Sequence, residues 1–111
     1  MPTASELYNE GDKLKDAGNL EEAIAKFEAA LAEDPGHALS HLALAVVLGR
    51  VGRHEEAVEH GQKACEIEPN EAFNFTAMSV TYQRAFAGTQ NHHYIQLAEE
   101  AMARAHMLQQ R

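Results

Sequence analysis

Apolar residues along the chain recur at intervals of three and four positions, the spacing that places side chains on one face of an α-helix. In the first segment, Leu7, Gly11 and Leu14 mark such a face. Gly18 follows, and glycine readily adopts the left-handed conformation in which helices end. A second helical pattern then runs until Pro35, since proline cannot continue the backbone hydrogen bonds of a helix. The pattern therefore predicts a pair of helices in the first third of the chain.

The same pattern returns after 34 residues. The matched positions are Ala4, Ala38 and Ala72; Leu14, Leu48 and Tyr82; Gly18 and Gly52; Glu21-Glu22-Ala23 and Glu55-Glu56-Ala57; Ala30 and Ala64; and Pro35 and Pro69. A period of this length is that of a helix–turn–helix unit, and stacked units of this kind bury a continuous core. The sequence therefore predicts one all-α domain over residues 1–111, built from units at 4–37, 38–71 and 72–108.

The residue types at the matched positions resemble those of the tetratricopeptide repeat family. The first helix of each unit has a large, a small and a large side chain at these positions, and the second helix has Ala, a large side chain and Ala, followed by Pro. The residues that carry the resemblance are Leu7, Gly11 and Leu14; His41, Ala45 and Leu48; Phe75, Ser79 and Tyr82; and Ala23, Phe27, Ala30 and Pro35. The resemblance implies a right-handed α-solenoid of three antiparallel helix pairs that acts as a protein-interaction scaffold without catalysis.

The second unit departs from the family pattern at two positions. His41 stands where a large aromatic or aliphatic residue is usual, and Gly61 stands where the first unit has Phe27. Glycine also lowers helix stability by up to about 1 kcal/mol relative to alanine. We therefore expect thin packing around Gly61.

In the third unit the alanine pattern of the second helix returns seven residues late, as Ala98, Met102 and Ala105. Seven residues make about two helical turns. Two interpretations remain open: a lengthened last hairpin, in which Gly88 ends the first helix and residues 88–93 form the tip, or a surface loop over residues 85–93. No separate polar capping helix is visible after this unit, so the last pair either caps itself or pairs with another copy.

In the resemblance, partners bind in the concave groove formed by the first helix of each unit. The inward positions that we predict are Tyr8, Asp12 and Lys15 in the first unit; Leu39, Leu42, Val46 and Arg50 in the second; and Phe73, Thr76, Val80 and Arg84 in the third, with Ser5, Asn9, Asp16, Ala43 and Ala77 beside them. The middle of this set is apolar and its entrance is acidic. It suits an extended or helical peptide with apolar anchors. The alternative is a homo-oligomeric structural or assembly protein whose groove or terminal hairpin is filled by another copy.

One binding mode of the family is not expected. Members that capture the C-terminal carboxylate of a chaperone resemble one another in having Lys, Asn and Arg at positions that hold Tyr8, Asp12, Ala43, Phe73 and Ala77 in this chain. An aspartate at position 12 would repel a carboxylate.

Charge narrows the class of partner. Nine basic and seventeen acidic residues give a formal net charge of -8, so nucleic acid and anionic membrane surfaces would be repelled. Residues 1–36 hold three basic and nine acidic side chains, which favours a partner with a basic segment near the first unit. The same glutamates also fit ordinary solvated helix faces.

The sequence gives little support for a disulfide, a metal site, a cofactor or catalysis. Cys65 is the sole cysteine, so it forms no internal disulfide and builds no cysteine-based zinc site. His37 and His41 are four residues apart, but the first precedes the predicted helix and the second occupies a packing position. We therefore predict no metal, no cofactor and no enzymatic activity. The N-terminus has no signal-like segment, and we expect a cytoplasmic protein.

Overall fold

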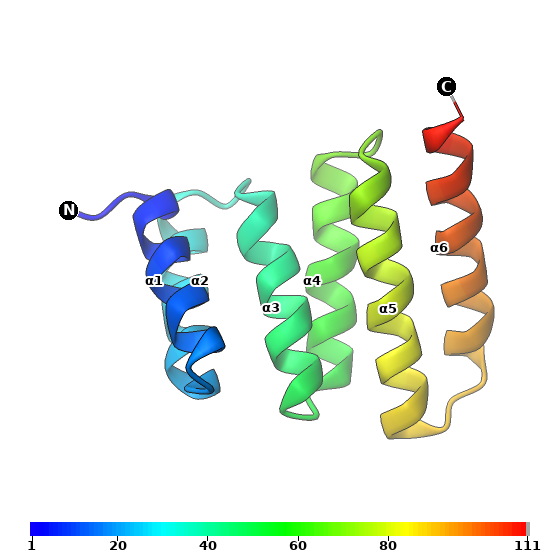
Figure 1. The fold of residues 1–111 in the computed structure, drawn as a ribbon, viewed down its shortest axis with the longest axis horizontal. Coiled ribbons are helices and arrows are strands. Elements are labelled where there is room, and N and C mark those ends of the chain that lie inside the picture. The colour runs from blue at the N-terminus through cyan, green and yellow to red at the C-terminus, as the bar shows by residue number, and fades with distance from the viewer. Residues whose placement is uncertain (111) are drawn as a thin grey trace.

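The computed structural model describes residues 1–110, which form six α-helices and no strand (Figure 1). The helices are α1 (Ala4–Asp16), α2 (Leu20–Glu33), α3 (Ala38–Arg50), α4 (His54–Ile67), α5 (Ala72–Thr89) and α6 (His93–Gln109). The first helices of the three pairs thus begin at 34-residue intervals, and the predicted all-α repeat fold is confirmed. Arg111, the last residue of the predicted domain, lies outside the described residues.

The pairs stand side by side from α1 and α2 at one end to α5 and α6 at the other (Figure 1). The described residues extend over 40 × 33 × 20 Å. Helix α3 packs against both α1 and α5, whereas α2 and α4, and likewise α4 and α6, have no Cα atoms within 8 Å of each other in residues 1–110. The first helices therefore form a continuous layer, while the second helices are held apart.

Left-handed residues end three of the helices. Gly18 and Gly52 have φ values of +85° and +87°, and they follow the ends of α1 and α3. The sequence prediction for Gly18 is confirmed. At the start of α1, Thr3 and Glu6 form a capping box in which the Thr3 hydroxyl accepts a hydrogen bond from the Glu6 backbone N–H at 3.1 Å.

The last pair is a lengthened hairpin rather than a surface loop. Helices α5 and α6 have 18 and 17 residues, compared with 13 and 14 in the first pair. The prediction that Gly88 ends α5 was wrong, because the imidazole of His54 packs against Gly88 while the helix continues. Gln90 takes the left-handed conformation instead, with φ of +62°. The side chain of Asn91 then accepts a hydrogen bond from the His93 N–H at 3.1 Å, which starts α6.

Glycines allow large side chains to approach the helix backbone. A Cβ atom on Gly11 would lie 2.6 Å from Cε1 of Phe27, and the ring of Phe27 is fully buried. A Cβ atom on Gly61 would lie 2.5 Å from the sulfur of Met78. The expectation of thin packing at Gly61 was therefore wrong, because a side chain of the next helix pair fills the space.

Two histidines meet inside the second pair. Nε2 of His41 lies 3.1 Å from the carbonyl oxygen of Pro35, which can only accept a hydrogen bond, so this nitrogen carries the proton in the neutral ring. Nδ1 of His41 then has the lone pair, and the Nδ1–H of His60 donates to it at 3.0 Å. His41 is buried and His60 is half-buried. The neutral pair is thereby satisfied, whereas protonation of both rings would place two N–H groups against each other.

Burial lowers the pKa of both imidazoles below the usual value for histidine, and the neighbouring ring lowers the pKa of His60 further. The carbonyl of Pro35 opposes the shift at His41. The other groups that act on the pair are Lys63 and His37, which lower the pKa of His41, and Glu28, Glu59 and Glu56, which raise that of His60. The folded protein therefore resists protonation at this place more than the unfolded chain does.

This resistance predicts a loss of stability in acid. Unfolded histidine binds its proton near pH 6.5, so below about this pH the unfolded state binds more protons, and stability falls as the pH drops towards the folded pKa values. Between pH 7.5 and pH 5, we expect the urea midpoint of the wild type to fall more than the urea midpoint of His41→Leu. Leucine is chosen because Leu7 occupies the same position in the first unit. His93→Gln, an exposed control, should behave as the wild type does; an unchanged pH dependence in His41→Leu would contradict the account.

Two matched glycine substitutions test the backbone contacts. Gly11→Ala should destabilise the protein by about 1–3 kcal/mol, because the ring of Phe27 cannot move without leaving its site. Gly49→Ala should leave stability unchanged or raise it by up to about 1 kcal/mol, because its Cβ would lie at an ordinary 3.7 Å from Arg84 and alanine favours the helix. Urea unfolding followed by circular dichroism measures both. Equal stabilities for the two variants would refute the role of Gly11.

Candidate functional site

A cavity of about 210 Å³ opens between the three first helices and is called the groove below. Its lining residues come from α1, α3 and α5 only: Tyr8, Lys15, Leu39, Leu42, Ala43, Val46, Phe73, Ala77 and Thr81. The structure thus brings together six of the eleven predicted groove residues, namely Tyr8, Lys15, Leu39, Leu42, Val46 and Phe73. The other five, Asp12, Arg50, Thr76, Val80 and Arg84, do not line the cavity.

Large apolar side chains are exposed at the groove. Leu39 is 52% and Phe73 is 62% exposed, and these are the second residues of α3 and α5. Leu42, at 8%, is buried and forms part of the floor. Exposed apolar side chains grouped around a cavity are typical of a surface that contacts another molecule.

The wall on the side of α1 is built around Tyr8. Its ring lies 5.7 Å from the ring of Phe27 and 5.7 Å from that of His37, measured between centroids. Burial raises the pKa of the Tyr8 hydroxyl; nearby Asp12 also raises it and Lys15 opposes this. The ammonium group of Lys15 lies 3.0 Å from the carboxylate of Asp12. The predicted acidic entrance is thus locally neutralised, and Tyr8 offers a neutral hydroxyl group.

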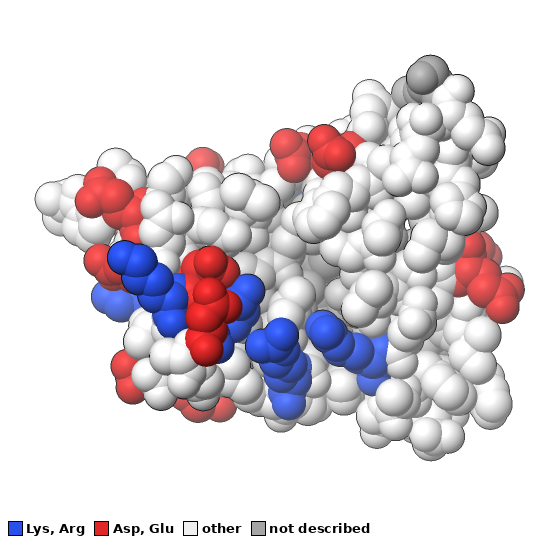
Figure 2. Space-filling view, in the orientation of Figure 1, with Lys and Arg blue, Asp and Glu red and all other residues white. Residues whose placement is uncertain are grey.

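Two arginines continue the face of the groove beyond the cavity. Arg50 follows Val46, and Arg84 follows the partly exposed Val80, each by one helical turn on the same face. Cδ of Arg84 lies 3.7 Å from the position that a Cβ on Gly49 would take, so the stem of this side chain reaches α3. Figure 2 shows basic side chains over the lower parts of α3 and α5 on this face of the molecule.

The two threonines near the groove turn their hydroxyl groups to their own helix. Thr76 donates to the carbonyl of Ala72 at 3.3 Å, and Thr81 donates to that of Ala77 at 3.1 Å. Thr81 is a lining residue that the sequence reasoning missed, although its place one turn after Ala77 could have revealed it. Neither hydroxyl proton is free to bind a ligand in this arrangement.

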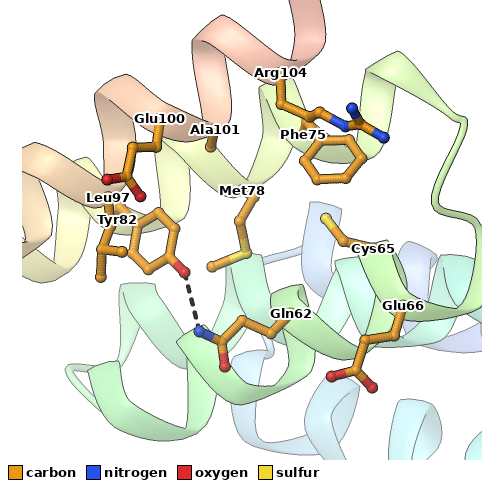
Figure 3. A pocket seen from close by; sticks show the side chains of 10 residues that line it. All are labelled: Gln62, Cys65, Glu66, Phe75, Met78, Tyr82, Leu97, Glu100, Ala101 and Arg104. Carbon is orange, nitrogen blue, oxygen red and sulfur yellow. Dashed lines mark hydrogen bonds between the residues drawn. The ribbon is translucent and has the colours of Figure 1, made fainter. Parts of the chain in front are cut away.

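A second cavity of about 510 Å³ lies on the outer side, between α4, α5 and α6 (Figure 3). Its lining residues are Gln62, Cys65, Glu66, Phe75, Met78, Tyr82, Leu97, Glu100, Ala101 and Arg104. The side chain of Gln62 donates a hydrogen bond to the hydroxyl of Tyr82 at 3.0 Å, and the guanidinium of Arg104 lies 5.8 Å from the ring centre of Phe75.

The repeat explains why this outer cavity exists. When the seven inserted residues are allowed for, Ala101 matches His60 and Phe75 matches His41. In the second pair the ring of His60 lies 5.2 Å from that of His41 and occupies the space between the helices. The methyl group of Ala101 is too small to do the same, and the space stays open.

The outer cavity shows no sign of nucleophilic or metal chemistry. Burial raises the pKa of the Cys65 thiol to about 11, and Glu66 adds to the shift, so the thiolate is scarce at neutral pH. Within residues 1–110 no three histidine, cysteine, aspartate or glutamate side chains gather as a metal site would require. In the same part of the chain, no helix combines the length and hydrophobicity needed to cross a bilayer.

A third cavity, also about 510 Å³, lies on the outer face of the last pair and is called the open end below. It is lined by Ser79, Gln83, Phe86, Ile95, Ala98, Glu99 and Met102. Ile95 is 38% exposed. In a longer stack this is the surface on which another helix pair would pack.

Solved structures with the same fold confirm the architecture. MamA matches with a TM-score of 0.82 at 18% identity, over 97% of this chain and 59% of that one. YrrB, described as a TPR protein with an unusual peptide-binding site, matches with a TM-score of 0.80 at 20% identity, over 98% of this chain and 53% of that one. This chain thus spans little more than half the length of either protein.

A third structure is similar over nearly its whole length. The second TPR of Spaghetti (RPAP3), bound to an HSP90 peptide, matches with a TM-score of 0.79 at 20% identity, over 96% of this chain and 92% of that one. A comparison with curated protein sequences finds no match. The family model of the tetratricopeptide repeat matches residues 8–72, more than half of the sequence. The chain therefore belongs to the tetratricopeptide repeat family.

Proposed function

We propose that the protein is a non-catalytic interaction scaffold that binds a peptide or helix of a partner protein in the groove. The observation that carries this proposal is the pair of exposed apolar side chains, Leu39 and Phe73, beside a cavity with an apolar floor. Burial of two such side chains supplies the anchoring contacts that peptide recognition needs.

The structural relatives support peptide binding in this fold. One is bound to an HSP90 peptide and another is described as having a peptide-binding site. At 20% identity, each likeness shows a shared fold alone. The basic segment expected from the acidic first third of this chain, and the cytoplasmic location, stay predictions.

Peptide selection tests the groove. A random twelve-residue library displayed on phage is panned on the protein, and the best binders are synthesised and measured by fluorescence polarisation. The double variant Leu39→Ala/Phe73→Ala should bind them at least tenfold more weakly, because each truncation removes contact area from the centre of the interface.

The matched control truncates two exposed apolar residues outside the groove, as Ile95→Ala/Met107→Ala. It should bind the peptides as the wild type does. Failure of the library to yield any specific binder, or equal binding by the groove variant, would refute the proposal. Leu42 is unsuitable for this test because it is buried, and its loss would alter stability as well.

Self-association through the open end is a second candidate function. Ile95 and Met102 match His54 and Gly61 of the second pair when the insertion is allowed for. Those two residues are covered by the next pair, His54 by Gly88 and Gly61 by Met78, whereas their counterparts face outwards. The open end therefore presents the kind of surface on which a further helix pair packs.

Mass measured against concentration tests this candidate. Light scattering over a hundredfold concentration range should show a species larger than 12.2 kDa that dissociates on dilution, and Ile95→Lys should remain a monomer throughout. The same change would leave peptide binding in the groove intact. A constant mass of 12.2 kDa in the wild type would exclude self-association over the range measured.

A further inference from the structure

Arg50 and Arg84 occupy the same position in successive repeats, since they are 34 residues apart on α3 and α5. Each follows an apolar residue of the groove face by one turn. Arg50 is exposed, and Arg84 is partly covered where its stem meets α3. The two guanidinium groups therefore extend the groove with positive charge on a protein whose net charge is -8.

These two charges have no ion-pair partner among the residues that the structure describes. Lys15, Lys26, Arg53 and Lys63 each have a carboxylate within 4 Å. Neither Arg50 nor Arg84 has one anywhere in residues 1–110, and the same holds for Lys13 and Arg104. Asp12, which lies on α1 near the groove, is already paired with Lys15. Figure 2 shows basic side chains over the lower ends of α3 and α5, with an acidic group beside them over α1.

The position that matches the two arginines in the first repeat is occupied by Asp16, which is exposed. This repeat position therefore carries a negative charge on α1 and a positive charge on α3 and α5, although Lys15 places a positive charge next to Asp16. A bound segment would meet Leu39 and Phe73 as apolar anchors and Arg50 and Arg84 further down the same two helices. The positive charges of Arg50 and Arg84 therefore favour one orientation of a bound peptide over the other.

From this arrangement we infer that the groove selects peptides whose side-chain carboxylates, from Asp or Glu, bind Arg50 and Arg84. Their apolar anchors contact Leu39 and Phe73, which lie eleven residues, roughly 16 Å of helix, before the two arginines. The inference rests on the proposed function of the groove and names the chemistry of its partner. Guanidinium groups bind carboxylates through two parallel N–H···O hydrogen bonds, and a pair without internal partners can do so without breaking an existing contact. The positions used differ from those of the family's terminal-carboxylate site, which hold Tyr8, Asp12, Ala43, Phe73 and Ala77 here.

Charge reversal provides the test. The random phage library is panned in parallel on the wild type and on Arg50→Glu/Arg84→Glu. Wild-type binders should be enriched in Asp and Glu at about five residues from an aliphatic or aromatic anchor, the length of extended chain that spans the distance from Leu39 or Phe73 to the arginines. Binders of the variant should be enriched in Lys and Arg instead. Synthetic wild-type binders should bind the variant at least tenfold more weakly, and they should weaken as NaCl is raised from 50 to 500 mM.

The matched control carries the same change of charge away from the groove, as Lys26→Glu/Lys63→Glu on α2 and α4. It should select the same peptides as the wild type. Circular dichroism checks that each variant is folded, and Arg50→Gln/Arg84→Gln replaces the reversal variant if that one does not fold. The glutamine variant should lose both the acidic preference and the salt dependence.

The outcomes separate this inference from the proposed function. Peptides that need Leu39 and Phe73 but show no acidic enrichment would overturn the role of the arginines and leave the groove intact as a binding site. Absence of any wild-type binder would overturn both. Peptides that lose affinity when their C-terminus is amidated, although their internal carboxylates are replaced without effect, would assign the arginines to a terminal carboxylate and contradict the inference.

Discussion

The spacing between the helices depends on the contact of a large side chain with a glycine on the helix it faces. Phe27 meets Gly11 within the first pair, whereas Met78 meets Gly61 between the second pair and the third. His54 meets Gly88 in the same way and ties the start of α4 to the far end of α5. The same kind of contact therefore allows helices to approach closely both within a pair and between neighbouring pairs.

That spacing determines which side chains remain for other molecules. The core takes one face of each first helix, and the opposite faces of α1, α3 and α5 become the walls of the groove. The second helices do not approach one another, so the gaps between them must be filled by side chains. His60 occupies the gap in the second pair, while Ala101 leaves the matching gap open as the outer cavity.

Much of this architecture could be predicted from the sequence, because the 34-residue period and the helix-ending Gly18 are local signals. Six of the residues that line the groove were expected from the helical period together with the family resemblance. The partners of Gly61 and Gly88 could not be predicted, since Met78 and His54 are distant in sequence and only the stack brings them close. A lengthened hairpin and a surface loop were both compatible with residues 85–93. The hydrogen bond between His41 and His60 likewise depends on the packing of two helices. Arg50 and Arg84 were predicted as groove residues but lie beyond the cavity, and their lack of carboxylate partners among the described residues is visible only in three dimensions.

The central claim is that a partner peptide lies along the first helices. Backbone amide NMR spectra recorded during titration with a library-selected peptide test it most directly, because the amide signals of each helix report separately on peptide binding. The account predicts shift changes concentrated on α1, α3 and α5 around Leu39, Val46 and Phe73, with α2 and α6 largely unaffected. Changes centred instead on the outer cavity near Ala101, or on the open end near Ile95, would contradict it.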